Sequence, residues 1–191
     1  MKKYFLSCIL LLAGLTVAFA QEKTVEGTND TTAVKASFWN NTYVQAADGL
    51  ALNLSAGIGN SFEVSAGKWF NKSVGVSINY TNVSIFDGSR SFSDNLIGAG
   101  FLWNIVGKKE RIGIWTPVLS PELGFMITTQ QGTNNSAYAA GSFYNYFRVH
   151  PNVDVLVNAK AYFGIDPHNT GRIPFISMPT GMLTVGARYR F

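Results

Sequence analysis

Hydrophobic and polar residues alternate with a period of two along much of this chain, a pattern typical of β-strands that have two different faces. The alternation is clearest in segments 74–81, 153–163 and 182–191. The last of these places Leu183, Val185, Ala187, Tyr189 and Phe191 on one face and Met182, Thr184, Gly186, Arg188 and Arg190 on the other. Weaker alternation occurs in segments 42–54, 62–70, 94–103, 118–129 and 137–149, which brings the predicted number of strands to eight.

The connections between these segments alternate between short turns and longer polar stretches. Asn71–Lys72 and His150–Asn152 carry residues that favour tight turns. Residues 84–93, 129–136 and 164–180 are polar and longer. Short turns at one end and long loops at the other are typical of transmembrane β-barrels. The sequence therefore predicts an all-β fold, an eight-stranded antiparallel up-and-down transmembrane β-barrel over residues 42–191.

Some connections fit this pattern less well. Residues 104–115 are long for the short-turn end, and residues 55–61 are short for the long-loop end. Pro117 and Pro121 lack the N–H that a strand donates to its neighbour, and a closed barrel has no free edge to hold them. We therefore expect the fifth strand to start late, near Pro121.

Aromatic residues gather near the ends of the predicted strands, as in the belts that membrane barrels place at the lipid–water interface. We predict that Trp69, Phe70, Trp103 and Trp115 form such a girdle. The opposite faces are small or polar, which suits the narrow interior of an eight-stranded barrel. The apolar faces are therefore expected to point outward into lipid. The alternative is a soluble lipocalin-like barrel with these faces inside.

Residues 1–20 have the pattern of a signal peptide. Lys2 and Lys3 precede an apolar run that ends in Ala18-Phe19-Ala20, a small-x-small cleavage site. Cys8 also allows a lipoprotein interpretation, but too few apolar residues precede it. Residues 21–41 are predicted to be a flexible polar leader, within which Asp30-Thr31-Thr32 resembles an O-glycosylation pattern or is a plain linker.

Composition narrows the class of protein further. The 191 residues are 47% apolar and only 14% charged, against about 25% charged in a usual soluble domain. No internal stretch approaches the roughly 20 apolar residues of a spanning helix. The formal net charge is +4, and loss of Lys2 and Lys3 lowers it to +2. Nucleic-acid binding therefore has no electrostatic support.

Four charged residues are placed by alternation on the inner face: Glu63, Glu122, Lys160 and Arg188. Ionised groups in a narrow interior are costly unless they are paired and hydrogen-bonded. We therefore predict that at least one acid–base pair among them plugs the lumen. The alternative is that these side chains reach solvent at the barrel mouth.

Catalytic patterns are weak. His150 lies in a predicted turn, and His168 lies in a predicted loop with Asp166 and Ser177. The two histidines are expected at opposite ends of the barrel, and a Ser-His-acid site needs its members within hydrogen-bond reach. No metal-ligand cluster or phosphate-binding loop occurs in the sequence, so no cofactor and no metal are expected. The basic run 108–111 contacts lipid headgroups or is a solvated turn.

The last eight residues, TVGARYRF, resemble the C-terminal assembly signal of bacterial outer-membrane barrels. This resemblance implies that Gly186, Tyr189 and Phe191 are read by the barrel assembly machinery. Segments 62–80, 101–104 and 152–163 resemble the OmpA-like barrel family of Bacteroidales-type bacteria. Many members of that family continue into a peptidoglycan-binding domain, which this sequence lacks after its last strand, so a tethering role is not implied.

We therefore expect a monomeric, non-enzymatic protein of the bacterial outer membrane, in contact with its lipid and lipopolysaccharide. Its expected role is structural, or surface interaction through loops 84–93, 129–136 and 164–180. Two alternatives remain at this point: a narrow pore or path for small solutes, and a lipid A-modifying enzyme.

Overall fold

A computed structural model describes residues 41–53, 56–87, 90–107, 111–129, 133–166, 175–176 and 179–191. The predicted signal peptide, Asp30-Thr31-Thr32, Lys108–Glu110, His168 and Ser177 lie outside these residues. The strands are β1 (Thr42–Asn53), β2 (Gly57–Trp69), β3 (Val74–Asp87), β4 (Arg90–Asn104), β5 (Trp115–Thr129), β6 (Thr133–His150), β7 (Val153–Asp166), β8 (Phe175–Ile176) and β9 (Thr180–Arg190).

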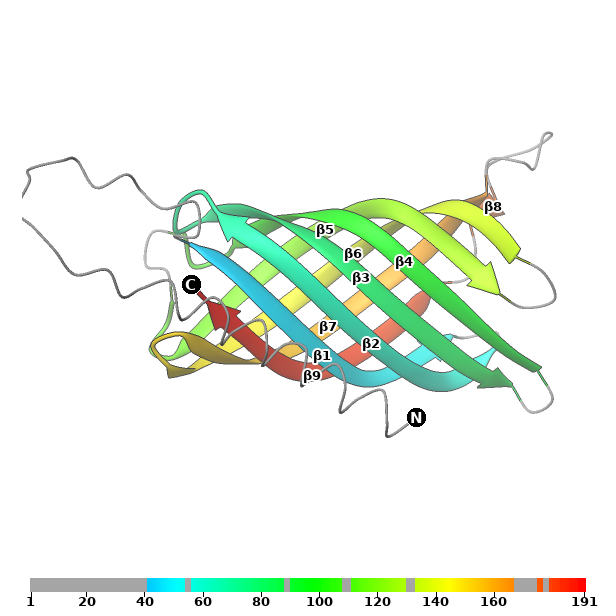
Figure 1. The fold of residues 1–191 in the computed structure, drawn as a ribbon, viewed down its shortest axis with the longest axis horizontal. Coiled ribbons are helices and arrows are strands. Elements are labelled where there is room, and N and C mark those ends of the chain that lie inside the picture. Colours follow the sequence, from blue (N-terminus) through cyan, green and yellow to red (C-terminus); the bar gives the residue numbers. More distant parts are fainter. Residues whose placement is uncertain are drawn as a thin grey trace, which may run out of the picture. The chain divides into compact units, whose positions relative to one another are not determined.

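The long strands form one closed antiparallel sheet, as predicted (Figure 1). Each strand from β1 to β7 pairs with the next, and β9 closes the barrel between β7 and β1. The two-residue β8 adds to the end of β7. No helix in the described residues is long and apolar enough to cross a membrane.

The register gives the barrel its tilt. Residue partners traced once round the barrel from Tyr43 return to β1 at Asn53, ten residues further along. In an eight-stranded barrel this stagger corresponds to strands tilted by roughly 40°, within the range of outer-membrane barrels. The interior is then just wide enough to be filled by side chains.

We name the two ends of the barrel by their connections. The turn end holds Phe191 and the short turns at Asn71–Lys72 and His150–Asn152, and the opposite end is the loop end. The strands are longer than predicted at the loop end. Strands β3 and β4 pair as far as Asp87 and Arg90. Strands β5 and β6 pair as far as Thr129 and Thr133. The predicted long loops 84–93 and 129–136 are therefore wrong, and among the three only the 164–180 connection is long.

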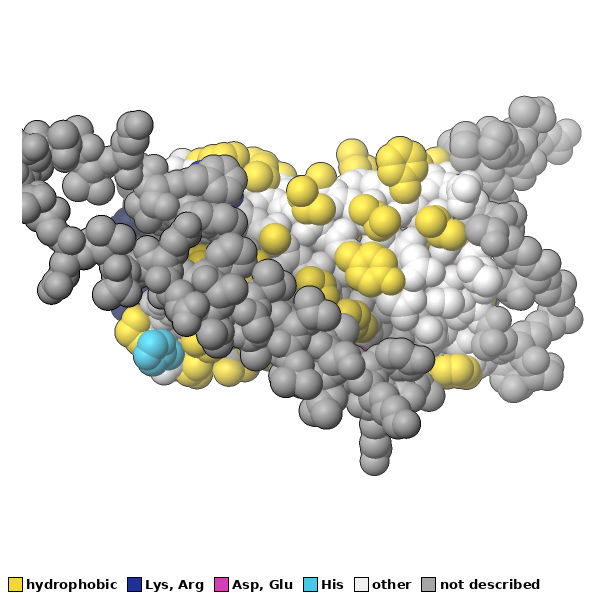
Figure 2. All heavy atoms as spheres, in the orientation of Figure 1, with side chains coloured by type: hydrophobic (Ala, Val, Ile, Leu, Met, Phe, Trp, Pro, Cys, Tyr) yellow, Lys and Arg dark blue, Asp and Glu magenta, His cyan; other side chains and the backbone are white. Residues whose placement is uncertain are grey.

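The physical reason is a reversal of the two faces near the loop end. On β3, Val83 and Ile85 point inward and are fully buried, whereas Asn82 on the outer face donates hydrogen bonds to Ser93 and Asn95 of β4 at 3.1 and 3.0 Å. Near the loop end the outward residues are polar, so in the sequence this segment resembles a loop. In the structure it belongs to strands that continue beyond the apolar middle of the outer surface. Figure 2 shows hydrophobic side chains over the middle of the barrel and polar surface toward this end.

Strand β5 begins at Trp115, six residues before Pro121, so the late start predicted for it is wrong. Both prolines pair with β6, Pro117 opposite Asn145 and Pro121 opposite Gly141. On the other side of β5, pairing with β4 is interrupted between Glu122 and Leu119. The sheet therefore accommodates Pro121 by a local gap in one ladder without a change of register.

Candidate functional site in the barrel lumen

The lumen is filled in three layers. Near the turn end, the lower cluster of buried residues consists of Tyr43, Ala47, Leu102, Val118, Tyr144, Tyr146 and Leu156. Near the loop end, the upper cluster consists of Ala51, Val83, Ile85, Leu96, Met126, Tyr138, Tyr162 and Met182. A charged layer lies between them, and three of the four predicted lumen charges meet there.

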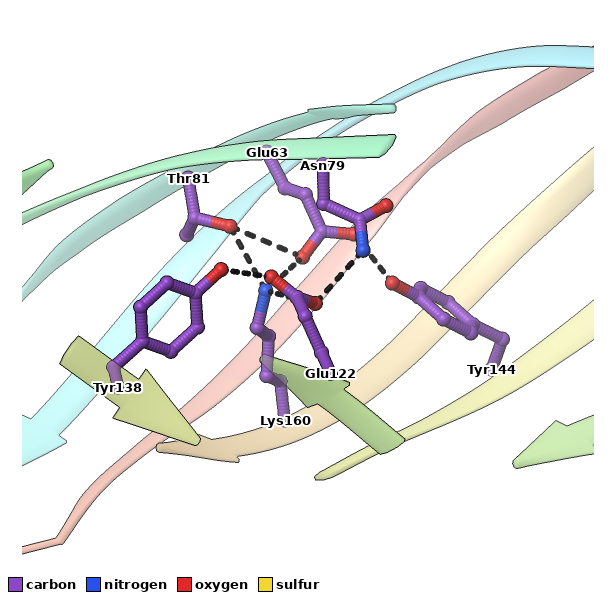
Figure 3. Close-up of polar contacts among 7 residues, drawn as sticks. All are labelled: Glu63, Asn79, Thr81, Glu122, Tyr138, Tyr144 and Lys160. Carbon is purple, nitrogen blue, oxygen red and sulfur yellow. Dashed lines mark hydrogen bonds and ion pairs between the residues drawn. The ribbon is translucent and has the colours of Figure 1, made fainter. Parts of the chain in front are cut away.

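Lys160 of β7 is the centre of this charged layer (Figure 3). Its ammonium lies 3.3 Å from a carboxylate oxygen of Glu63 on β2 and 3.0 Å from one of Glu122 on β5. All three side chains are at most 1% exposed. One lysine thus joins strands on opposite sides of the barrel through two ion pairs.

Neutral donors complete the coordination of the two carboxylates. Asn79 donates to Glu122 at 2.8 Å, and Tyr138 also donates to Glu122. Tyr144 donates to Glu63 at 3.0 Å. Lys160 itself donates to Thr81 at 3.0 Å. Burial of ionised groups is tolerated when their remaining hydrogen-bonding sites are satisfied in this way.

The balance of charge explains these extra donors. Two carboxylates and one ammonium leave one negative charge in a region shielded from water. Phenol and amide donors offset such a charge without bringing in a further cation. We name Glu63, Asn79, Thr81, Glu122, Tyr138, Tyr144 and Lys160 the central network.

Arg188 does not join the central network. Its Nε and Nη2 donate to Asp154 of β7 at 2.8 and 2.6 Å, and its guanidinium stacks on the ring of Tyr146, 3.3 Å from the ring centroid. Arg190 and Arg148 also contact Asp154, at 3.1 and 3.7 Å. The predicted set of four therefore divides into a central group of three and a separate arginine cluster at the turn end.

A fourth buried acidic residue, Asp94 of β4, lies nearer the loop end. Tyr162 donates to it at 2.7 Å and Thr128 at 2.6 Å. The residues predicted for the lumen did not include Asp94, Asp154 or the buried tyrosines Tyr43, Tyr138, Tyr144, Tyr146 and Tyr162. Alternation placed Asp154 and Tyr162 on the inner face, and the spacing of Tyr144 and Tyr146 by two residues was a further available signal.

The structure places the four residues of the predicted aromatic girdle in different surroundings. Trp103 and Phe70 are 52% and 61% exposed, and Trp115 donates from its indole to Asn145 at 3.0 Å. Trp69, however, packs against the lower cluster inside the barrel. Its assignment to an outward girdle is wrong, because Trp69 shares the inner face of β2 with Glu63 and Ser65.

Gly186 and Tyr189 of the predicted assembly signal lie on the closing strand β9, and Phe191 follows its last residue. Gly186 pairs with Ala47 of β1 and Leu156 of β7, and a Cβ at this position would lie 2.6 Å from the Cα of Ala47. Tyr189 and Phe191 form an edge-to-face pair with centroids 5.1 Å apart. The tight approach at Gly186 gives this residue a packing role in barrel closure.

His150 is exposed at the β6–β7 turn, where it accepts a hydrogen bond from the backbone N–H of Asn152 at 3.4 Å. No group of three or more potential metal-ligating side chains occurs in the part of the chain that the structure describes.

Comparison with known proteins reveals similarity at the level of structure. No family model and no curated protein matches the sequence. The crystal structure of Neisserial surface protein A matches with a TM-score of 0.62 and 21% identity, over 80% of this chain and 98% of that one. The N-terminal β-barrel domain of Pseudomonas aeruginosa OprF matches with a TM-score of 0.55 and 13% identity, over 80% and 98%.

A third solved structure, the outer membrane protein OprG from Pseudomonas aeruginosa, matches with a TM-score of 0.50 and 10% identity, over 80% of this chain and 96% of that one. The fold is that of an outer-membrane barrel. At these identities the likeness concerns the arrangement of strands, and the lumen contacts described above are this chain's own.

Proposed function

We propose that this protein is an integral outer-membrane β-barrel of a Gram-negative bacterium, with a structural or surface-interaction role and a lumen closed to solutes. The observation that supports the closed lumen is the central network between two packed clusters. Lys160, Glu63 and Glu122 meet at the barrel axis with almost no exposed area. An open pore of this diameter needs a continuous wetted path, which these layers interrupt.

The outer surface supports the membrane placement. Ile78, Leu123 and Phe125 are 70%, 68% and 75% exposed on the middle of the strands. Such a band is unfavourable in water and suits contact with lipid. Closure of the sheet also satisfies the backbone hydrogen bonds that hydrocarbon cannot provide.

The surface-interaction role rests on the loop end. Rigid scaffolds commonly carry binding residues on their connecting segments. The connection between β7 and β9 is the long one at that end, so we propose residues 164–180 as the binding segment. Contacts with lipopolysaccharide, recognition by the barrel assembly machinery through Gly186, Tyr189 and Phe191, export by residues 1–20, and a monomeric state belong to the same proposal.

Two measurements test the proposal together. The full chain is expressed in a Gram-negative host, and the outer-membrane fraction is examined for a band that migrates faster before heating than after. The purified barrel is then added to planar lipid bilayers. We expect a heat-modifiable band and no conductance steps. Reproducible conductance steps would refute the closed lumen and favour a narrow pore, and a soluble product would refute the membrane placement.

A further inference from the structure

A hollow of about 350 Å³ opens in the mouth of the barrel at the turn end. It is lined by four cationic side chains from three parts of the chain: Lys72, Arg148, Arg188 and Arg190. Trp69 and Phe191 line it as apolar neighbours, and amide and hydroxyl side chains such as Asn104 and Thr116 complete the lining. This composition differs from that of the lumen above it, where acidic residues outnumber Lys160.

The described side chains that line this hollow include these four cations and no acid. Arg148, Arg188 and Arg190 contact the carboxylate of Asp154 at 3.7, 2.6 and 3.1 Å. A lining of this composition favours a negatively charged ligand.

Arg188 is held in place by its neighbours, and one of its donor nitrogens has no hydrogen-bond partner. Asp154 binds its Nε and Nη2, and the rings of Tyr146 and Tyr43 lie 3.3 and 5.6 Å from its guanidinium carbon. Its Nη1 has no hydrogen-bond partner, although the side chain is only 4% exposed. A buried donor without a partner is unfavourable, so a ligand that accepts this hydrogen bond would be favoured.

We infer that this hollow binds a phosphate group. Guanidinium groups recognise phosphate through paired hydrogen bonds, and a preorganised arginine loses little entropy on binding. A lysine adds a mobile point charge at the rim. The volume exceeds that of a bare phosphate ion, so the bound group is a phosphate ester with a small substituent, placed against Trp69 and Phe191. By the proposed function this mouth faces the periplasm, but the binding chemistry does not depend on that orientation.

The test uses the mature barrel folded in an uncharged sugar detergent, titrated calorimetrically with inorganic phosphate, glycerol 3-phosphate and sodium chloride. We expect both phosphates to bind, with glycerol 3-phosphate tighter, and chloride to compete weakly. The double variant Lys72→Gln/Arg190→Gln is expected to bind about tenfold more weakly. The matched control is Lys68→Gln, since Lys68 is near the same end of β2 but does not line the hollow; its affinity is expected to stay within about twofold.

A second arm distinguishes the two sources of phosphate ester. Barrels purified from membranes are examined by native mass spectrometry for retained phospholipid. Retention by the parent and by Lys68→Gln, with loss from the double variant, identifies a lipid headgroup. Binding of glycerol 3-phosphate without lipid retention identifies a soluble ester. No heat of binding for either phosphate, equal competition by chloride, or equal weakening by Lys68→Gln overturns the inference.

Discussion

At the scale of single residues, Lys160 compensates the charge of two buried carboxylates and so contributes to the stability of the barrel. It is the cation that the described structure places beside both Glu63 and Glu122. Removal of one partner from a buried ion pair typically costs about 3–5 kcal/mol, because the remaining charge stays buried. We therefore expect Lys160→Met to lower the free energy of unfolding in lipid vesicles by that amount, measured by urea titration and the heat-modifiable band.

The triple variant Lys160→Met/Glu63→Gln/Glu122→Gln separates charge from packing. It removes the cation and both carboxylates together, so we expect it to recover most of the lost stability. Lys68→Met, which removes a cation from the outer face, is the control and should change stability by less than about 1 kcal/mol. A loss of the same size in the single and triple variants would contradict the electrostatic explanation.

The tryptophans provide a second residue-scale prediction. Trp103 is exposed on the outer face of β4, whereas Trp69 packs inside the barrel. In variants that keep only one of the four tryptophans, with phenylalanine at the other positions, brominated lipid should quench the fluorescence of Trp103 strongly and that of Trp69 weakly. Equal quenching of both would place Trp69 on the outer face, as the sequence predicted, and would contradict the structure.

At the scale of elements, closure between β1 and β9 depends on a close backbone approach. A Cβ at Gly186 would lie 2.6 Å from the Cα of Ala47, so Gly186→Ala forces the two strands apart. We expect a loss of about 1–3 kcal/mol and slower folding into vesicles. Gly141→Ala on β6 is the matched control, because its added Cβ meets no heavy atom within 4 Å.

This comparison also tests the assembly signal. If Gly186→Ala folds normally into vesicles without any cellular factor but fails to reach the outer membrane in cells, its role is recognition rather than packing. Defects in both assays support the steric role. Equal behaviour of Gly186→Ala and Gly141→Ala in both assays would contradict both roles.

The alternation of side chains predicted the strands, because a period of two is a local property of the chain. The inner faces were predicted from their small and polar residues and from the aromatic residues near the strand ends, and the barrel from the pattern of short and long connections. Strand ends were predicted less well. At Asn82 and Val83 polar residues face outward and apolar residues face inward. This reversal could not be predicted, because the sequence does not give the position of each residue along the barrel axis. Likewise, alternation placed both Lys160 and Arg188 on the inner face. The register of the strands then determines that Lys160 pairs with Glu122 and Arg188 with Asp154.

At the scale of the whole molecule, charge is distributed unevenly along the barrel. Glu63, Glu122 and Asp94 lie at the centre and toward the loop end, whereas Arg148, Arg188 and Arg190 lie at the turn end. Each group contacts partners from several strands, so the same contacts that fill the lumen also link strands distant in sequence. The outer surface follows a different rule, since it must match the surrounding lipid.

Asp48 is the exception to that rule and gives the last prediction. It is exposed midway along β1, its cross-strand neighbours are Phe62 and Val185, and the hydrogen bond recorded for its carboxylate comes from the backbone N–H of Gly49 at 2.9 Å. An acidic side chain on the lipid face of a barrel is destabilising, by less than the roughly 2–4 kcal/mol found for basic residues at the midplane. We therefore expect Asp48→Ala to stabilise the barrel by about 1 kcal/mol in vesicles, measured by urea titration. Asn60→Ala, on the outer face of β2 nearer the loop end, should change stability by less. Destabilisation by Asp48→Ala would contradict this placement and would mean that the carboxylate has a favourable partner in the membrane.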